Sequence, residues 1–282
     1  MSFRLACVQL NVGDDIAANT DACLGFIRAA ARDGAAFIAT PENTGCMVAP
    51  GTSAFAKGFA EADHPALARY RDAAKELGVW LLIGSLWIAA PDGKRVANRQ
   101  FLIAPDGGIT GRYDKIHMFD VDLANGEQYR ESRSFAPGDR ALVSDTPFGR
   151  LGHSICYDLR FPHLYRALAH AGAEFISVPA AFTRTTGMAH WHVLLRARAI
   201  ETGAYVFAPA QCGTHPGDRL TYGHALIVAP WGEILADAGE SPGLVAANLD
   251  LAEVARVRAS VPAWRADADF APPAMPAARA AE

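Results

Sequence analysis

Short apolar runs alternate with helix-like patterns along almost the whole chain, and this alternation restricts the folds that the chain can adopt. Residues 4–10 and 98–104 are predicted to form strands, and residues 16–32 and 190–202 are predicted to form helices. Turn signals, such as Pro-Asp-Gly at residues 91–93, separate several neighbouring strands and indicate hairpins. Crossover helices and hairpins together predict an α/β fold with mixed β-sheets.

The chain shows no internal boundary before its C-terminal end. No linker rich in glycine, serine or charge divides it, so we expect one domain over residues 1–262. A hydrophobic content of 51% in 282 residues is sufficient for a large core. Residues 263–282 are expected to form a tail, extended or disordered at its end, because it is rich in Pro and Ala. The pattern is compatible with two sheets packed face to face under outer helices, or with one open sheet.

The composition argues against several classes of protein. The net charge of −4 gives no basic surface for nucleic acid. Five scattered cysteines without a CxxC motif argue against both a disulfide framework and a zinc site. No apolar stretch of about twenty residues predicts a membrane span, and the N-terminus has the pattern of a strand rather than a signal peptide. We therefore expect a cytoplasmic protein with no metal, no cofactor and neither nucleic-acid nor membrane partners.

Three chemically complementary residues are predicted at the ends of strands. Cys156 follows an apolar run and precedes a helix-like segment, a turn that holds a thiol rigidly while its sulfur stays open to a ligand. A lone cysteine is more often a small buried hydrophobic residue. However, Glu42 also follows a strand, where Pro41 fixes the chain, and Lys115 lies among aromatic residues after another strand-like run. A nucleophile, a base and a cation are thus each predicted directly after a strand.

The sequences around these residues resemble the nitrilase, or carbon–nitrogen hydrolase, superfamily over residues 4–262. The matching segments are Pro-Glu, Lys-Ile-His-Met-Phe-Asp and Cys-Tyr-Asp-Leu-Arg-Phe-Pro, in that order. The resemblance implies a four-layer α-β-β-α sandwich in which Cys156 attacks an amide carbonyl and Glu42 is the general base. It also implies that Lys115 and the backbone N–H of Tyr157 stabilise the oxyanion. A thioester would form and then be hydrolysed by water that Glu42 activates.

Two further residues have more than one interpretation. Glu131 matches a second glutamate of the superfamily, which implies that it orients Lys115 or the substrate amine; the alternative is a solvated loop residue. Arg160 would bind a substrate carboxylate in a bidentate pair, as in related carbamoyl-amino-acid hydrolases. Alternatively, Arg160 is a structural partner of Asp158.

The histidines near these segments are not expected to be catalytic. His153 lies three residues before Cys156 on a predicted strand, so its side chain should point to the opposite face and not form a Cys-His dyad. His117 is expected to form a pocket wall or to bind a backbone carbonyl. His190 and His192 do not predict a metal site, because no third ligand is suggested.

Later segments are similar to one branch of the superfamily, the deaminated glutathione amidases and omega-amidases. They are Ala189-His-Trp191, residues 194–201, Ala210-Gln-Cys-Gly213, Tyr222-Gly-His224 and Pro230-Trp-Gly232. The chain departs from the branch at His192, where glutamate is usual, and at Asn43-Thr44-Gly45. We expect both loops to border the substrate. The residues expected to contact substrate are Tyr157, Arg160, His117, Phe182, Thr183, Arg184 and Trp191.

These observations predict a hydrolase that cleaves the C–N bond of a small carboxylate-bearing amide through a Cys thioester and releases ammonia. Arg160 and Arg184 are the expected carboxylate anchors. A deaminated glutathione amidase is the first choice, and an omega-amidase, an N-carbamoyl-amino-acid amidohydrolase or a nitrilase are alternatives. A catalytically inactive scaffold that binds partners is the alternative of another class. We expect a homodimer or a higher homo-oligomer, formed through the helical faces at residues 164–173 and 193–204.

Overall fold

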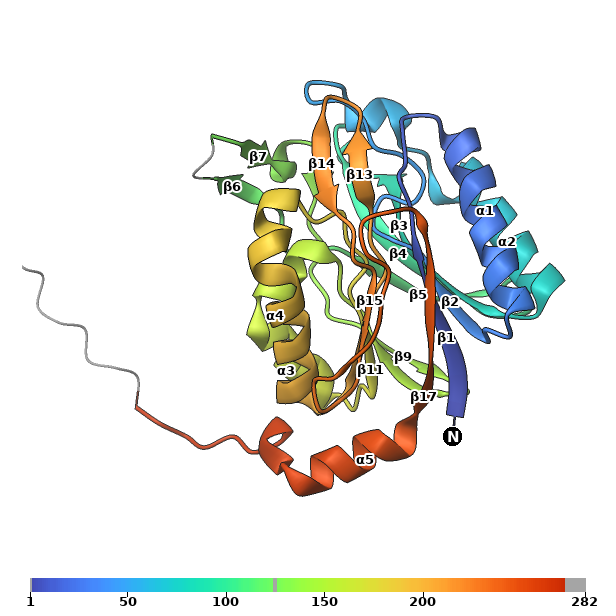
Figure 1. Cartoon of the computed structure of the whole chain (residues 1–282). Helices are drawn as coiled ribbons and strands as arrows, with labels where there is room; N and C mark the ends of the chain where they lie inside the picture. Colours follow the sequence, from blue (N-terminus) through green and yellow to red (C-terminus); the bar gives the residue numbers. More distant parts are fainter. Residues whose placement is uncertain (1, 124–125, 272–282) are drawn as a thin grey trace, which may run out of the picture.

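The computed structural model describes residues 2–123 and 126–271, which form two β-sheets flanked by helices (Figure 1). The first sheet has the order β17-β1-β2-β3-β4-β5, with β8 beside β4. Strands β1, β2 and β3 are parallel, and the pairs at both edges are antiparallel. Its strands are β1 (Ser2–Gln9), β2 (Phe37–Ala39), β3 (Trp80–Ala89), β4 (Val96–Ile103), β5 (Ile109–Asp114), β8 (Phe135–Ala136) and β17 (Gly243–Asp250).

The second sheet has the order β16-β15-β12-β11-β10-β9. Its central strands β10, β11 and β12 are parallel, whereas β9, β15 and β16 pair antiparallel with their neighbours. Both sheets are therefore mixed, as predicted. The strands are β9 (Val143–Thr146), β10 (Gly149–Gly152), β11 (Phe175–Ser177), β12 (Tyr205–Ala208), β15 (Leu226–Val228) and β16 (Ile234–Asp237).

Helices cover the outer face of each sheet, so the molecule has four layers. Helices α1 and α2 contact strands of the first sheet, and α4, which packs on α3, contacts strands of the second (Figure 1). The predicted α-β-β-α sandwich is confirmed. The helices are α1 (Ile16–Arg32), α2 (Pro65–Leu77), α3 (Pro162–His170), α4 (Arg184–Thr202) and α5 (Leu251–Ser260).

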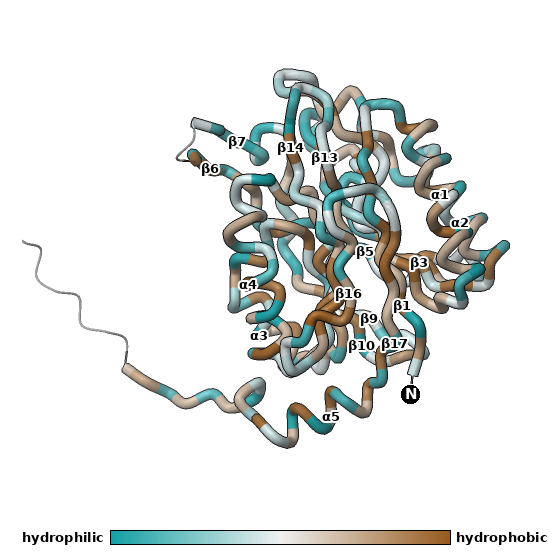
Figure 2. Tube along the Cα trace, in the orientation of Figure 1, coloured by the Kyte–Doolittle hydropathy of each residue, from teal (hydrophilic) through white to brown (hydrophobic). Residues whose placement is uncertain are grey.

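An aromatic cluster packs between the two sheets. The Phe37 ring of the first sheet lies 5.7 Å from the Phe175 ring and 5.8 Å from the Phe207 ring of the second, centroid to centroid. All three residues are fully buried. Figure 2 shows hydrophobic stretches on strands such as β1 and β3, and a mixture of hydrophobic and hydrophilic residues along the helices. Burial of a side chain of this size stabilises the fold by about 1.5–3 kcal/mol, so the sheet-to-sheet interface is a main source of stability.

Local signals explain where the helices begin and end. The Asp15 carboxylate accepts hydrogen bonds from the N–H groups of Ala17 and Ala18 and caps α1. Helix α2 ends at Gly78, whose φ of 65° lies in the left-handed region that favours glycine. The predicted helix at residues 190–202 begins earlier, at Arg184. Pattern alone missed this first part because it carries little apolar periodicity.

Two short hairpins were not predicted. They consist of β6 (Asp120–Asp122) with β7 (Gln128–Arg130), and β13 (Cys212–His215) with β14 (Arg219–Tyr222). Their strands have three or four residues and are largely polar, so they lack the alternation that identifies a strand.

The first part of the predicted tail packs against the domain. The Arg166 guanidinium of α3 donates hydrogen bonds to the carbonyl oxygens of Ala263 and Ala266 and pairs with Asp267. The Arg258 guanidinium lies over the ring of Trp264, 4.4 Å from its centroid. Residues 272–282, to which the prediction of an extended or disordered end applies, lie outside the described residues. None of the helices in the described ranges is long and apolar enough to span a membrane.

Candidate active site

The two sheets contribute different parts of one site. Glu42 follows β2 and Lys115 follows β5 in the first sheet, whereas Cys156 follows β10 in the second. Cys156 begins the short 3-10 helix η4 (Cys156–Arg160) with a φ of 48°, a left-handed conformation that residues other than glycine rarely adopt. Its N–H donates to the Pro179 carbonyl oxygen at 2.9 Å. Such strained backbone at a strand exit is typical of a functional position.

Lys115 joins two carboxylates inside the protein. Its Nζ lies 2.9 Å from Oε1 of Glu42 and 2.8 Å from Oε1 of Glu131. The Lys115, Glu42 and Glu131 side chains are only 2%, 3% and 12% exposed. Glu131 is therefore not a solvated loop residue, and its contact with Lys115 is the one that the sequence predicted for an orienting residue.

The environment fixes the charges of these groups. Burial raises the pKa of Glu42, but the Lys115 ammonium and hydrogen bonds from Lys115, the Cys156 thiol and the Ala181 N–H outweigh it and hold this pKa below its usual value. Burial and then the Glu42 charge raise the pKa of Cys156 well above its usual value. Burial lowers the pKa of Lys115, but the charges of Glu131 and Glu42 raise it overall. At neutral pH Glu42 is therefore a carboxylate, Lys115 an ammonium and Cys156 a neutral thiol.

Neighbouring polar groups hold the Glu42 carboxylate in place. Asn98 Nδ2 donates to Oε1 at 2.8 Å, and the Ala181 N–H donates to Oε2 at 2.8 Å. Gln211 Nε2 donates to the Glu42 carbonyl oxygen at 3.0 Å. Sequence reasoning missed Asn98 and Gln211. An asparagine within an apolar strand pattern was the available signal for Asn98.

Asp158 organises the turn that carries Cys156. Its carboxylate accepts hydrogen bonds from the Ile155 N–H and from the Tyr113 hydroxyl. It also lies 2.7 Å from Nδ1 of His117. The alternative that Arg160 is a structural partner of Asp158 is not supported, because these groups occupy the fully buried Asp158 carboxylate.

A cavity of about 610 Å³ opens onto the three residues Glu42, Lys115 and Cys156. This size is ordinary for a small-molecule site. Of the residues expected to contact substrate, Tyr157, Phe182 and Thr183 line it. Asn43 lines it as well, and its Oδ1 accepts a hydrogen bond from Trp87 Nε1 at 2.7 Å. The remainder of the wall includes Met47, Phe119, Tyr129, Arg130, Arg133, Phe135, Thr186 and Arg219.

Four of the residues expected to contact substrate do not line this cavity. The His117 ring stacks on Phe161 at 3.5 Å. Arg184 forms an ion pair with Glu240 at 3.1 Å. The expectation that His117 and Arg184 bind substrate therefore finds no support in this geometry.

The other two residues, Arg160 and Trp191, are also absent from the cavity lining. The Arg160 guanidinium lies over the Phe182 ring, 5.1 Å from its centroid, and its Nη1 lies 3.2 Å from Nδ1 of His190. Trp191 is fully buried, and its Nε1 donates to the His224 carbonyl oxygen. Their expected contact with substrate is likewise unsupported.

Three further histidines, His153, His192 and His224, take part in hydrogen bonds with other side chains. His192 Nε2 lies 3.0 Å from Oδ2 of Asp237, and His224 Nδ1 lies 2.9 Å from Oδ1 of the same residue. His192 therefore does not border the cavity, contrary to expectation. His153 is fully buried against Gln100 and Ser144, and burial lowers its pKa to about 3. It has no contact with Cys156, as predicted.

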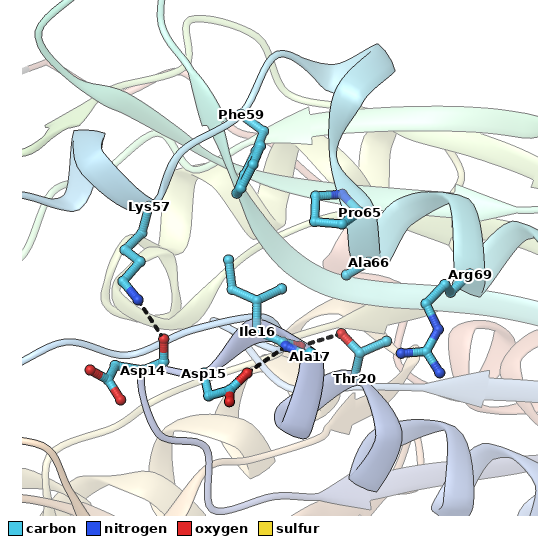
Figure 3. Close-up of a pocket in the computed structure, with 10 residues that line it drawn as sticks. All are labelled: Asp14, Asp15, Ile16, Ala17, Thr20, Lys57, Phe59, Pro65, Ala66 and Arg69. Carbon is cyan, nitrogen blue, oxygen red and sulfur yellow. Dashed lines mark hydrogen bonds between the residues drawn. The ribbon is translucent and has the colours of Figure 1, made fainter.

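A second hollow lies at the start of α1, and its lining residues are distinct from those of the cavity above (Figure 3). Its volume is about 490 Å³. Ile16, Phe59 and Pro65 form an apolar wall, and Lys57 Nζ donates to the Asp14 carbonyl oxygen at 2.9 Å. Arg69 pairs with Asp21. Its two cations, Lys57 and Arg69, thus already have partners within the protein.

A buried Glu-Lys-Cys group between the sheets of an α-β-β-α sandwich defines a thiol-dependent hydrolase. The carbon–nitrogen hydrolase family model matches residues 4–259. The chain belongs to the carbon–nitrogen hydrolase family.

Sequences of named relatives align with nearly the whole chain. It is 40% identical to the deaminated glutathione amidase of Synechocystis sp., over 92% of this chain and 96% of that protein. It is 35% identical to the omega-amidase of Homo sapiens, over 94% of each chain. The crystal structure of the C. elegans NitFhit protein is 34% identical, with a TM-score of 0.85. That match covers 93% of this chain but 64% of NitFhit.

The active-site cysteine of one structural neighbour reacts with an amide compound. In a structure of a glutamate-to-glutamine mutant of the amidase from Nesterenkonia sp. AN1, the acetamide moiety of fluoroacetamide is covalently added at the active-site cysteine. That protein is 27% identical to this chain, with a TM-score of 0.77 over 90% of this chain and 92% of that one. This chain is an enzyme, a carbon–nitrogen hydrolase of the amidase type with a Glu-Lys-Cys triad. An inactive scaffold is therefore not its function.

Proposed function

We propose that the enzyme hydrolyses the C–N bond of a small carboxylate-bearing amide, with Cys156 as nucleophile, Glu42 as base and Lys115 as oxyanion donor. One observation carries the proposal: Lys115 Nζ lies within 2.9 Å of two buried carboxylates beside a thiol in a small-molecule cavity. Glu131 is assigned to orienting Lys115.

The first half of the reaction forms an acyl-enzyme. Glu42 takes the proton of the Cys156 thiol as sulfur attacks the amide carbon. The carbonyl oxygen becomes an oxyanion, which the Lys115 ammonium and the Tyr157 N–H stabilise. Glu42 then gives its proton to the leaving nitrogen, the C–N bond breaks, and a thioester remains on Cys156.

The second half releases the acid. Glu42 removes a proton from water, which attacks the thioester carbon and forms a second oxyanion at the same donors. This intermediate collapses by breaking the C–S bond, and the proton held by Glu42 returns to sulfur. One water is consumed, and an acid and an amine or ammonia are the products.

The names of the relatives support deaminated glutathione as the first candidate substrate. Its amide nitrogen belongs to a cysteinyl residue, so hydrolysis would release cysteinylglycine. The expected release of ammonia applies only to primary amides. An omega-amide of a short acid is the second candidate, because the human omega-amidase is 35% identical over 94% of the chain.

A substrate panel tests this function. The purified enzyme is incubated with deaminated glutathione, short omega-amides, N-carbamoyl amino acids and nitriles. Released amine, ammonia, carbon dioxide and consumed nitrile are measured separately. Amine or ammonia release from a carboxylate-bearing amide supports the proposal. Preferential carbon dioxide release or nitrile consumption would favour the carbamoyl or nitrile alternatives, and turnover of none of these compounds would refute it.

We further propose that the enzyme works as a homodimer in the cytoplasm. All five cysteines are free and buried, and a catalytic thiol needs a reducing compartment. Met188, Val193 and Ile200 of α4 are 55–68% exposed. Trp231, 53% exposed, follows β15 in the turn where Gly232 accepts a hydrogen bond from Arg196 of α4. We define these four apolar residues as the α4 surface and propose that it forms the dimer contact.

Helix α3 was also expected to contribute to this contact. Among the described residues, α3 carries no large exposed apolar side chain, and its Arg166 is covered by residues 263–267. The proposed contact is therefore restricted to α4 and the turn beside it.

A further inference from the structure

The hairpin β13–β14 closes one side of the active-site cavity. Its strand β14 pairs with the segment that follows β11, through a bridge between Thr221 and Thr183 and a hydrogen bond from the Tyr222 N–H to the Phe182 carbonyl oxygen. A Cβ on Gly217 would lie 2.4 Å from Cδ of Pro50, so the hairpin turn also touches the loop opposite. The first residue of β14 is thus held at the cavity wall.

That residue is Arg219. Its Nη2 donates to the Ala181 carbonyl oxygen at 3.2 Å, and its Cζ lies 5.6 Å from the centroid of the Tyr129 ring. Its Nε is buried and has no hydrogen-bond partner. Across residues 2–123 and 126–271, no carboxylate lies within 4.0 Å of its guanidinium. Most of the five donors of the guanidinium therefore have no partner among the described residues.

The other cations near the site either have partners or are exposed to solvent. Lys115 lies between Glu42 and Glu131, and Arg130 forms two hydrogen bonds to the Asp122 carboxylate at 2.6 and 2.9 Å. Arg184, which the sequence suggested as an anchor, pairs with Glu240 outside the cavity. Arg133 lines the cavity but is exposed to solvent. Arg219 is thus the half-buried cation at this wall that lacks a carboxylate.

An unpaired guanidinium in a half-buried wall is a costly arrangement unless a ligand completes it. Its planar fork matches a carboxylate, which it binds through two parallel hydrogen bonds. Resting on the proposed function, we propose that Arg219 binds the carboxylate of the amide substrate and determines the preference for acidic over neutral amides.

The experiment compares two matched pairs of substrates. One pair is deaminated glutathione and its analogue with the glycine carboxylate converted to a carboxamide, which keeps the carboxylate at the keto-acid end and so tests the glycine carboxylate alone. The other is glutaramate and pentanamide, in which a methyl group replaces the carboxylate. For each pair, the specificity ratio is kcat/KM of the first compound divided by kcat/KM of the second, which lacks one carboxylate. It is measured for the wild type, Arg219→Met, Arg219→Lys and, as control, Arg184→Met.

Arg219→Met should lower the specificity ratio of at least one pair by about 10- to 100-fold, the scale of one charge-assisted pair. The loss should be mainly in KM, because binding to a remote carboxylate is the same in ground and transition states. Arg219→Lys should restore part of the ratio by keeping the charge, and Arg184→Met should leave it unchanged.

A purely structural role would give a different result. If Arg219 acted only through the Ala181 backbone, which also holds Glu42, Arg219→Met would lower kcat equally for acid and neutral amides. That result, or an unchanged specificity ratio in both pairs, would overturn the inference. If both the wild type and Arg219→Met prefer the acids, the assignment of Arg219 is wrong. The proposed function is then unaffected.

If a variant turns over too slowly for kinetic measurement, substrate binding is measured instead. Calorimetry of deaminated glutathione with Cys156→Ala and with the double variant Cys156→Ala/Arg219→Met gives two dissociation constants without chemistry. The double variant should bind about 10-fold or more weakly while its thermal unfolding is unchanged. Equal dissociation constants would refute the assignment. A wild type that turns over neither pair and binds neither acid would overturn the proposed function and this inference together.

Discussion

The position of Lys115 between two carboxylates decides the chemistry of the site. A thiol with a raised pKa is a poor nucleophile by itself, so its proton must leave as attack occurs. Glu42 can accept that proton because the Lys115 ammonium keeps it ionised despite complete burial. The same ammonium is placed to stabilise an oxyanion. Lys115 thus both keeps the base ionised and stabilises the transition state.

The pH dependence of thiol reactivity tests this coupling. The Lys115 ammonium holds the pKa of Glu42 below its usual value of 4.5, so the base should remain ionised in mildly acidic solution. The rate of Cys156 alkylation by iodoacetamide should therefore be nearly constant from about pH 8 to about pH 5 in the wild type. In Lys115→Met, only the hydrogen bonds from Cys156 and Ala181 still oppose the effect of burial, so the pKa of Glu42 rises and the rate should begin to fall at a higher pH.

Thermal unfolding of both proteins is the control for this comparison, because removal of one partner from a buried ion pair destabilises the fold. Identical pH profiles for folded wild type and folded Lys115→Met would show that Lys115 does not set the ionisation of Glu42.

At the scale of elements, the sequence predicts the parts of the site that follow long apolar strands. The strands before Glu42 and Cys156 are buried and apolar, so the hydrophobic pattern of the sequence showed where each of them ends. Hairpin β13–β14 was not visible, because its strands are short and polar. Arg219 lies on this hairpin and was therefore not predicted as a carboxylate anchor. Arg160 was predicted instead, because of the family resemblance. Which arginine reaches the cavity depends on packing between distant segments, and a local pattern does not contain that information.

Strand β3 must approach the segment before Glu42 closely, and Gly84 permits this approach. A Cβ at Gly84 would lie 2.1 Å from the Thr40 carbonyl oxygen and 2.3 Å from that of Pro41. Gly84→Ala should therefore destabilise the fold by about 1–3 kcal/mol and reduce activity by displacing Glu42. Gly25, exposed on α1 with open space around its Cβ position, is the matched control.

Gly25→Ala should stabilise the fold by about 1 kcal/mol, because alanine has the higher helix propensity, and should leave activity unchanged. Chemical denaturation and kcat measurements compare both variants with the wild type. If Gly84→Ala were as stable and active as Gly25→Ala, the close approach of β3 to the catalytic segment would be of no consequence.

At the scale of the whole molecule, neither sheet holds a complete site. Glu42 and Lys115 come from one sheet and Cys156 from the other, so the aromatic packing between the sheets also fixes the catalytic distances. Side chains that meet across this interface are far apart in the sequence, which is why their contact was implied by resemblance rather than by periodicity.

The α4 surface leads to a prediction about assembly. Light scattering at micromolar concentration should give about 60 kDa, twice the chain mass of 30.0 kDa. Val193→Glu, at a residue 67% exposed, should shift the protein toward 30.0 kDa. Phe270→Glu, at an exposed residue of the C-terminal segment, should leave the mass unchanged. A wild-type mass of 30.0 kDa, or a dimer that Val193→Glu does not weaken, would contradict the proposed contact.

The most direct test of the mechanism is intact-protein mass spectrometry during turnover. The wild type and Glu42→Gln are mixed rapidly with a hydrolysable amide, quenched in acid and digested to locate any acyl group. An acyl thioester should be found on Cys156 and on no other cysteine, and Cys156→Ala should lack both adduct and turnover. Glu42→Gln should lower kcat by roughly 10²-fold or more. An active Cys156→Ala, or an acyl group on another residue, would contradict covalent catalysis by Cys156.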